Sequence, residues 1–151
     1  MKRVLLLGHL GKLGHAIDRA LSGRYEVIGA ASNTFDAAEP YSALVLIEQS
    51  NPDIIINCVG FMGLDACEKN PDRAFRINTL FPRALAAYTR APLIHFSTES
   101  VFPGREPKDP NVGVPYVEAE VTHPLNVYGV TKFASEEPVL MAQGIVFRLP
   151  V

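Results

Sequence analysis

The pair of residues best suited to chemistry in this sequence is a tyrosine and a lysine four positions apart, Tyr128 and Lys132. On a helix they would lie one turn apart on the same face. A phenol in that position can protonate a carbonyl oxygen as negative charge develops on it. Its ordinary pKa of about 10 is high for this task, and we expect the neighbouring ammonium to lower it by stabilising the phenolate. Thr98, which ends an apolar segment, would donate a hydrogen bond to the same oxygen.

A second candidate feature is a set of three glycines, Gly8, Gly11 and Gly14, which follows the apolar run 3–7. Glycine lets the backbone approach a ligand closely, and the N-terminus of a following helix offers free N–H groups to an anion. The spacing is G-x-x-G-x-x-G rather than the G-x-G-x-x-G of the dinucleotide dehydrogenases. We interpret the loop as a cradle for nucleotide phosphates, with His9 and Lys12 as residues that could favour phosphate.

These residues must be positioned by a regular alternation of strands and helices. Apolar, β-branched runs predict strands at 4–7, 26–30, 53–59, 93–97 and 145–148, and the segments between them predict helices at 12–21, 41–50, 72–90 and 126–143. Strands that are apolar throughout are typical of a parallel sheet covered on both faces. The pattern therefore predicts one α/β domain with a doubly wound, mainly parallel sheet, Rossmann-like, in three α/β/α layers. We expect a kink or a break at Pro82 and at Pro138, and a loop at 103–115.

Composition narrows the choice of partners and excludes several classes of protein. The 151 residues carry a net charge of −2, which gives no reason to expect nucleic acid or an anionic membrane as a partner. The apolar run 4–7 is too short for a signal peptide, and no stretch approaches the roughly 20 apolar residues of a membrane span. Cys58 and Cys67 indicate neither a disulfide framework nor a metal site. We interpret His95, inside a predicted strand, as a core histidine rather than a metal ligand.

Several stretches resemble the extended short-chain dehydrogenases/reductases, and among these the dTDP-4-dehydrorhamnose reductase group. They occur in that family's order and cover nearly the whole chain. The matching stretches are Pro52-Asp53-Ile54-Ile55-Ile56-Asn57, the segment from Asp65 to Pro71, Arg76-Ile77-Asn78, His95-Phe96-Ser97-Thr98-Glu99-Ser100-Val101-Phe102, and Pro124-Leu125-Asn126-Val127-Tyr128-Gly129-Val130-Thr131-Lys132.

The resemblance implies reduction of the 4-ketone of a nucleotide sugar by NADPH or NADH. We expect the protein in the cytoplasm. A homodimer is one oligomeric state that the sequence leaves open. The resemblance also implies Thr98, Tyr128 and Lys132 as the catalytic set, and Thr98 and Glu99 as substrate contacts. The residues predicted to bind the cofactor are Gly8, Leu10, Gly11, Lys12, Leu13, Gly14, Ser32, Asn33, Cys58, Val59, Gly60, Asn78, Ser97, Tyr128 and Lys132. No metal site is predicted.

Two departures from the family pattern bear on these expectations. Where relatives carry an acidic residue at the end of the second strand, this chain has Ala30-Ala31-Ser32-Asn33. An acid there binds the ribose 2′-hydroxyl and favours NAD, so its absence, with Ser32 and Asn33 able to bond a phosphate, favours NADP. Glu99-Ser100 stands where the family usually has Asp-Tyr. This difference predicts that the part of the pocket that faces the substrate differs from that of the relatives.

The end of the sequence and the role of the fold leave alternatives open. Family members continue for about another 100 residues or more, and Val151 stands where the group carries an aromatic that stacks on the substrate. We therefore expect a cofactor-binding part of a longer reductase rather than a natural short protein. Two other functions remain: a non-catalytic nucleotide-binding subunit, like the regulatory subunit of methionine adenosyltransferase, and a nucleotide-sugar epimerase or dehydratase with tightly held NAD.

Overall fold

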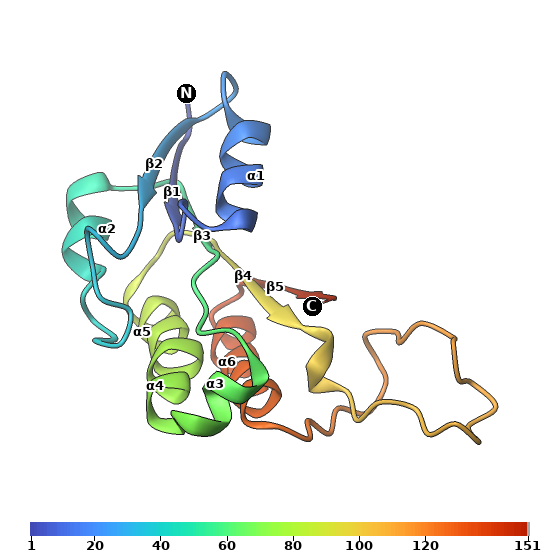
Figure 1. The fold of residues 1–151 in the computed structure, drawn as a ribbon. Helices are drawn as coiled ribbons and strands as arrows, with labels where there is room; N and C mark the ends of the chain where they lie inside the picture. The colour runs from blue at the N-terminus through green and yellow to red at the C-terminus, as the bar shows by residue number, and fades with distance from the viewer. Residues whose placement is uncertain (151) are drawn as a thin grey trace.

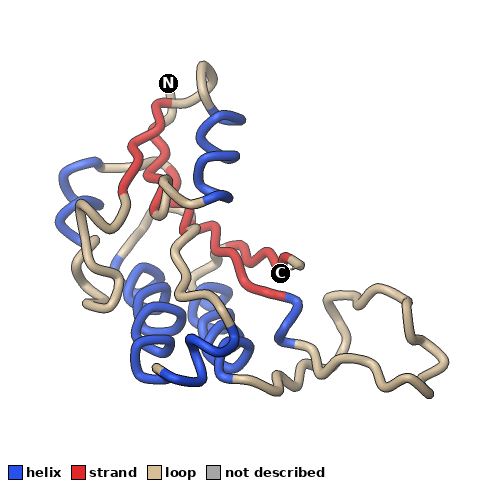
Figure 2. Tube along the Cα trace, in the orientation of Figure 1, coloured by secondary structure: helices blue, strands red, loops and turns tan. Residues whose placement is uncertain are grey.

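Five short strands form one parallel sheet in the computed structural model of the chain, which describes residues 1–150; Val151 lies outside the described residues. The strands are β1 (Arg3–Leu7), β2 (Glu26–Ala30), β3 (Ile54–Asn57), β4 (Leu93–Thr98) and β5 (Ile145–Leu149). Their order across the sheet is β2-β1-β3-β4-β5, and each neighbouring pair is parallel (Figures 1 and 2). The doubly wound fold predicted from the sequence is confirmed.

The two faces of the sheet are covered by different helices because side chains alternate along each strand. Leu5 packs with Leu85 and other residues of the helices on one face, whereas Leu6 packs with Ile17 of the first helix on the opposite face. Both leucines are fully buried. This alternation produces the three α/β/α layers, with α1 (Lys12–Leu21) on one side and α2 (Leu44–Ser50), α5 (Phe81–Tyr88) and α6 (Val127–Met141) on the other.

Helix boundaries follow local signals that the sequence carries only in part. The predicted helix 12–21 is confirmed, and α6 begins one residue later than predicted because the side chain of Asn126 caps it by accepting a hydrogen bond from the N–H of Gly129 at 2.7 Å. Helix α2 begins at residue 44 rather than 41, after a turn. Strand β3 ends at Asn57 rather than 59, because the chain leaves the sheet there.

The single helix predicted at 72–90 is a composite. It consists of α4 (Pro71–Phe75), a π-helical turn (Arg76–Leu80) and α5, and the short helix α3 (Leu64–Lys69) precedes it. The π-turn ends two residues before Pro82, whose missing N–H removes one hydrogen bond from the regular ladder. The expected disruption at Pro82 is therefore a change of helical register. Of the kink or break expected at Pro138, the break does not occur, since α6 continues to Met141.

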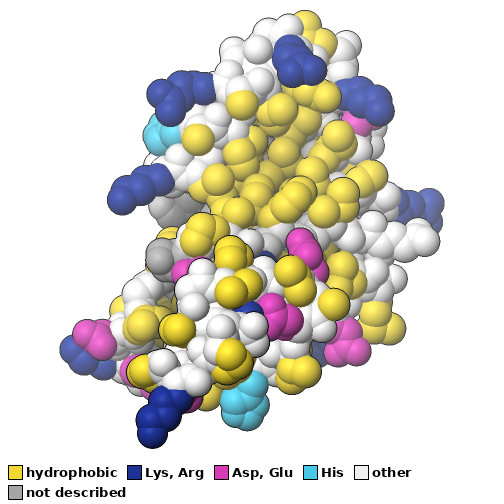
Figure 3. Space-filling model, turned by 90° about the vertical axis from the view of Figure 1, so that its right-hand side faces the viewer, with side chains coloured by type: hydrophobic (Ala, Val, Ile, Leu, Met, Phe, Trp, Pro, Cys, Tyr) yellow, Lys and Arg dark blue, Asp and Glu magenta, His cyan; other side chains and the backbone are white. Residues whose placement is uncertain are grey.

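Part of the sheet face on the α1 side remains open. Ile145 and Phe147 of β5 are about half exposed, and the ring of Phe147 stacks on that of Phe96 with 5.7 Å between centroids. Hydrophobic side chains form a broad patch on the side of the molecule shown in Figure 3. Within residues 1–150, no helix has the length and apolar character needed to cross a membrane.

The strand order determines where a ligand can enter. The chain passes from β1 to β2 on one side of β1, and later returns to place β3 on its other side. The connections therefore diverge between β1 and β3, and in open parallel sheets such a divergence leaves a crevice at the carboxyl ends of the strands. The glycine loop after β1 and the segment Cys58–Gly60 after β3 both lie at this edge.

Candidate functional site

Two adjoining cavities form a groove along the carboxyl edge of the sheet. The first, about 710 Å³, extends from the glycine loop toward the end of β2, and the second, about 530 Å³, extends toward α6. They share Gly11, Cys58, Val59 and Gly60 in their walls, so the groove is continuous across the glycine loop. A groove of this length and position suits an extended ligand with a phosphate-bearing middle.

The glycine loop has the geometry that its sequence predicts. Gly8 has φ of +80°, which favours glycine, and a Cβ at Gly14 would lie 2.3 Å from the carbonyl oxygen of Gly8, so only glycine lets α1 begin here. Gly11 is the N-cap of α1, with no side chain capping it and no acidic residue in the first turn. The N-terminal N–H groups of a ten-residue helix therefore face the middle of the groove.

The segment at the end of β2 differs from the expectation at two residues, Ala30 and Asn33. Ala30 is 2% exposed and packs in the core with Phe35, so it does not face the groove. Ser32 does line the first cavity, whereas Asn33 is exposed and is not among the wall residues of either cavity. The position at which an acid would reach a ligand is consequently Ser32, which follows the end of β2 and lines the cavity, whereas Ala30 points into the core.

Most residues predicted to bind a cofactor lie in the walls of this groove. They come from five separate segments of the chain that only the folded sheet brings together. In addition to the shared residues and Ser32, they are Gly8, Leu10, Lys12, Leu13, Gly14, Ser97, Tyr128 and Lys132. Glu99, predicted to contact a substrate, instead lines two smaller neighbouring cavities, of about 490 and 270 Å³, next to the loop after β4.

Tyr128 and Thr98 lie side by side, as expected. The pKa of the Tyr128 phenol, however, shifts upward and not downward. Tyr128 is 5% exposed, Thr98 is fully buried, and their side chains are hydrogen-bonded. Burial raises the pKa of Tyr128, the bond with Thr98 lowers it, and the nearby Cys67 raises it. The expectation that Lys132 lowers this pKa is therefore wrong for the chain by itself, since desolvation of the phenolate outweighs the opposing bond.

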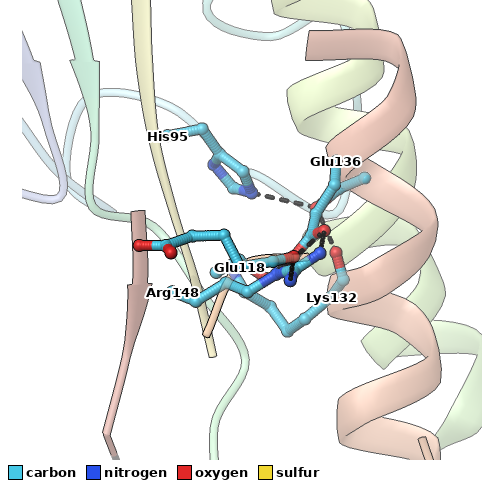
Figure 4. Close-up of polar contacts among 7 residues, drawn as sticks. His95, Glu118, Lys132, Glu136 and Arg148 are labelled. Atoms are coloured by element: carbon cyan, nitrogen blue, oxygen red, sulfur yellow. Dashed lines mark hydrogen bonds and ion pairs between the residues drawn. The ribbon is translucent and has the colours of Figure 1, made fainter. Parts of the chain in front are cut away.

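Lys132 is directed toward β4. Its Nζ donates a hydrogen bond to the carbonyl of Phe96 at 2.5 Å, while the side chain is 3% exposed (Figure 4). Burial lowers the pKa of Lys132 to about 8, although Glu136 and Cys58 raise it. Burial also raises the pKa of the Cys58 thiol to about 12, which keeps that wall residue neutral. One donor of the ammonium is occupied, and two remain for a ligand in the second cavity.

Asn78 lies behind the groove rather than in its wall. Its side chain brackets the backbone of Phe61, accepting from the N–H at 2.8 Å and donating to the carbonyl at 3.0 Å. It also donates to Oγ1 of Thr131 in α6 at 3.1 Å. The fully buried amide thus holds the loop after β3 against α6. The geometry makes it a support for the site and not a ligand contact.

Sequence reasoning missed the residues at the β2 end of the groove. Phe35, Asp36, Phe61, Arg73 and Ile77 line the first cavity, and Arg73 lies over the ring of Phe61 at 5.8 Å from its centroid. They belong to the loop after β2, to the loop after β3 and to the composite helix. No local spacing links them, so the sequence carries no short-range signal for this cluster.

Comparison with known proteins places the chain in a family. A family model described as the RmlD substrate binding domain matches residues 1–151. The chain belongs to this family. It is 33% identical over 154 residues to a dTDP-4-dehydrorhamnose reductase of Escherichia coli, a match that covers 96% of this chain and 50% of that protein. It spans about half the length of the curated relatives that it matches.

Solved structures of relatives share the fold described above. A dTDP-4-dehydrorhamnose reductase of Bacillus anthracis in complex with NADP superposes with a TM-score of 0.84 at 27% identity, covering 99% of this chain and 52% of that one. A dTDP-4-dehydrorhamnose reductase of Yersinia enterocolitica gives a TM-score of 0.86 at 27% identity, with 99% of this chain and 53% of that one covered. The family resemblance expected from the sequence motifs is confirmed.

A buried histidine behind the groove predicts a pH-dependent stability. His95 is fully buried, and its pKa lies well below 6.5 because burial disfavours the cation and Lys132 repels it. Below pH 6.5 the unfolded chain binds a proton that the folded chain does not, so stability is present above that pH and falls as the pH decreases. Urea unfolding should give a free energy that decreases between pH 7 and pH 5, by up to about 1.4 kcal/mol per pH unit from this group.

The variant His95→Gln should flatten this pH dependence, because it removes the titrating group. Replacing the exposed His15 by glutamine is the matched control and should leave the dependence as in the wild type. An equal decrease in stability toward pH 5 for His95→Gln and wild type would contradict the assignment of the effect to His95.

Proposed function

We propose that residues 1–151 form the NAD(P)-binding Rossmann domain of a reductase that acts on the ketone of a nucleotide sugar, with NADPH as the preferred cofactor. The observation that carries this proposal is the continuous groove, which has the glycine loop in the middle and Tyr128 and Lys132 at one end. The names of relatives support the substrate class, since the E. coli relative is called a dTDP-4-dehydrorhamnose reductase. The chain itself supplies the acid–base residues.

The groove suits a dinucleotide in its chemistry as well as its shape. The glycine loop and the uncapped start of α1 would hold the pyrophosphate, with Lys12 beside it. The first cavity, lined by Phe35 and Ile77, would take the adenosine half, and the second cavity would take the nicotinamide half. When bound, a reduced nicotinamide supplies a hydride for the carbonyl carbon of a ketone.

The residues of this chain would handle the proton of that reduction. The carbonyl carbon gains a hydride, and its oxygen gains a proton from the phenol of Tyr128, so that the ketone becomes a secondary alcohol. A raised pKa keeps Tyr128 protonated before reaction, which suits a proton donor. The hydrogen bond from Thr98 would stabilise the phenolate that remains. The Lys132 ammonium lines the second cavity and has donors left for the bound ligand.

The β2 end of the groove favours NADPH over NADH. Ser32, in the turn after β2, lines this end of the groove and carries no charge to repel a 2′-phosphate, and Arg73 lines the same cavity. Asp36 is also in this wall, but its Oδ1 accepts a hydrogen bond from the N–H of Ala38 at 2.9 Å, which orients the carboxylate toward its own loop. The relative from B. anthracis is in complex with NADP.

Binding of the pyrophosphate can be tested with Gly11→Asp. Gly11 has φ of −76°, which any residue adopts, and a Cβ there would meet only the carbonyl oxygen of Gly8, at 3.3 Å. The variant should therefore fold, and its carboxylate should repel the phosphates. Calorimetric titration should show NADPH binding to the wild type and none to Gly11→Asp, with Gly11→Ala as the steric control. An absence of binding to the wild type would refute the proposal.

Cofactor preference can be tested with Ser32→Asp. A carboxylate at this groove position should repel the 2′-phosphate of NADPH and accept a bond from the 2′-hydroxyl of NADH. The ratio of the two dissociation constants should move toward NADH by at least about tenfold, or about 1.4 kcal/mol. Asn33→Asp is the matched control, because it adds the same charge one residue outside the groove. Equal ratios for the two variants, or a wild type that prefers NADH, would contradict the selectivity argument.

Turnover can be tested with Tyr128→Phe in the reductase over its full length. Removing the phenol should lower kcat by about 10²–10⁴-fold, the range for general acid catalysis, while the dissociation constant for NADPH stays nearly unchanged. Tyr88→Phe, at an exposed tyrosine of α5, is the matched control and should keep wild-type activity. If Tyr128→Phe retained most of its ketone reduction, the proton would have to come from another group.

A further inference from the structure

Three consecutive residues of β4 are bonded to one turn of α6. Nε2 of His95 lies 2.9 Å from Oγ of Ser135, the carbonyl of Phe96 accepts from Nζ of Lys132 at 2.5 Å, and Oγ of Ser97 donates to Oε1 of Glu136 at 2.5 Å. All three side chains of the turn are buried. The turn that carries Lys132 is therefore fixed to the sheet at three points, which we call the β4–α6 contact. Figure 4 shows His95, Lys132 and Glu136, three of the residues that form it.

Counting donors determines the protonation of His95 within this contact. The hydroxyl of Ser135 has one proton, and it donates that proton to the carbonyl of Lys132 at 2.6 Å. Ser135 must then accept from His95, so Nε2 carries the ring proton and Nδ1 is the acceptor. Nδ1 lies 3.1 Å from Nδ2 of Asn57, which can only donate. The ring is thus the neutral Nε2–H tautomer, in agreement with a pKa well below its usual value.

A further hydrogen bond connects Asn57, and through it His95, to the wall of the groove. Oδ1 of Asn57 accepts from the N–H of Val59 at 3.0 Å, and Val59 lines both cavities. The bonds therefore run in one direction, from Val59 through Asn57, His95 and Ser135 to the carbonyl of Lys132. Each donor in this series has one acceptor. The series spans from the loop after β3 to α6, which are the two walls of the second cavity.

We propose that His95 is a positioning residue for Lys132: in its neutral tautomer it fixes the turn 132–135 of α6 to β4 through its bond to Ser135, and so fixes the place of Lys132 in the wall of the cavity proposed for the nicotinamide half. The proposal rests on the proposed function. His95 itself faces Asn57 and Ser135 and does not line the groove, so it acts through other residues and contacts no ligand.

Another connection between α6 and the sheet is independent of His95. Glu136 is held by Arg148 of β5, with Nη2 at 2.7 Å from Oε2 and Nε at 3.0 Å from Oε1. This ion pair joins α6 to β5 and does not involve the histidine. Loss of the bond from His95 should consequently loosen the turn that carries Lys132 relative to β4 without releasing α6 from the sheet, and the variants should fold.

Two substitutions of His95 separate its two bonds. His95→Gln places an amide at the depth of Nε2 and can still donate to Ser135. His95→Asn places an amide at the depth of Nδ1, near Asn57, and cannot reach Ser135. The bond between Asn57 and Val59 is local and persists in both variants. If the bond to α6 is the one that positions Lys132, His95→Asn should weaken cofactor binding and His95→Gln should not.

The experiment is a titration of each variant with NADPH, monitored by cofactor fluorescence, beside a thermal unfolding curve. We expect the dissociation constant to rise about tenfold for His95→Asn and for Ser135→Ala, and less than about twofold for His95→Gln. The double variant His95→Asn/Ser135→Ala should lose no more than either single variant, because both interrupt one series of bonds. Ser50→Ala is the matched control, since Ser50 is also buried and donates to a helix carbonyl, that of Leu46 in α2.

Each outcome decides between positioning and packing. Equal losses of affinity for His95→Asn and His95→Gln would overturn the proposal, because the loss of a side chain that only fills space would lower stability, and with it affinity, in both variants. Wild-type affinity for His95→Asn would also overturn it. If His95→Asn does not fold, Ser135→Ala tests the same bond. Failure of the wild type to bind NADPH would instead refute the proposed function, and the inference with it, and that result is recognisable before any variant is measured.

Discussion

The structure depends on the burial of polar groups between β4 and α6. His95 and Ser97 point from the sheet into a region where water does not reach, and burial of an unpaired polar group costs several times the net gain from an ordinary hydrogen bond. Every one of these groups has a partner in α6: Ser135 for His95 and Glu136 for Ser97. The requirement to satisfy them leaves one relative placement of strand and helix. That placement determines where Lys132 lies.

The groove then follows from the order of the strands. Because β1 has β2 on one side and β3 on the other, the loops at their carboxyl ends diverge and leave room for a ligand. The glycine loop faces the middle of this opening, and α6 brings Tyr128 and Lys132 to one end. Burial has opposite effects on the charges of this pair: it favours the protonated phenol of Tyr128 and disfavours the ammonium of Lys132. A neutral proton donor next to a readily titrated amine suits reduction of a carbonyl group.

The sequence was sufficient for the sheet and for the middle of the groove. Strand periodicity, the glycine spacing and the pair Tyr128 and Lys132 are local patterns, and the structure brings these residues together as predicted. The orientation of Ala30 was not predicted, because it depends on which face of β2 meets the core. The raised pKa of Tyr128 was not predicted either, since desolvation depends on the whole surroundings of the phenol. Arg73 entered the site only through the π-turn and the helices packed around it.

One continuous groove, from the end of β2 to α6, is the proposed binding site of a nicotinamide dinucleotide. Amide hydrogen exchange with and without saturating NADPH can show whether the whole groove is occupied. Binding along the whole groove should slow exchange together in three separate segments, 9–15, 58–61 and 128–133, with the exposed surface of α2 unaffected. Protection limited to one of these segments, or the same exchange rates with and without NADPH, would contradict it.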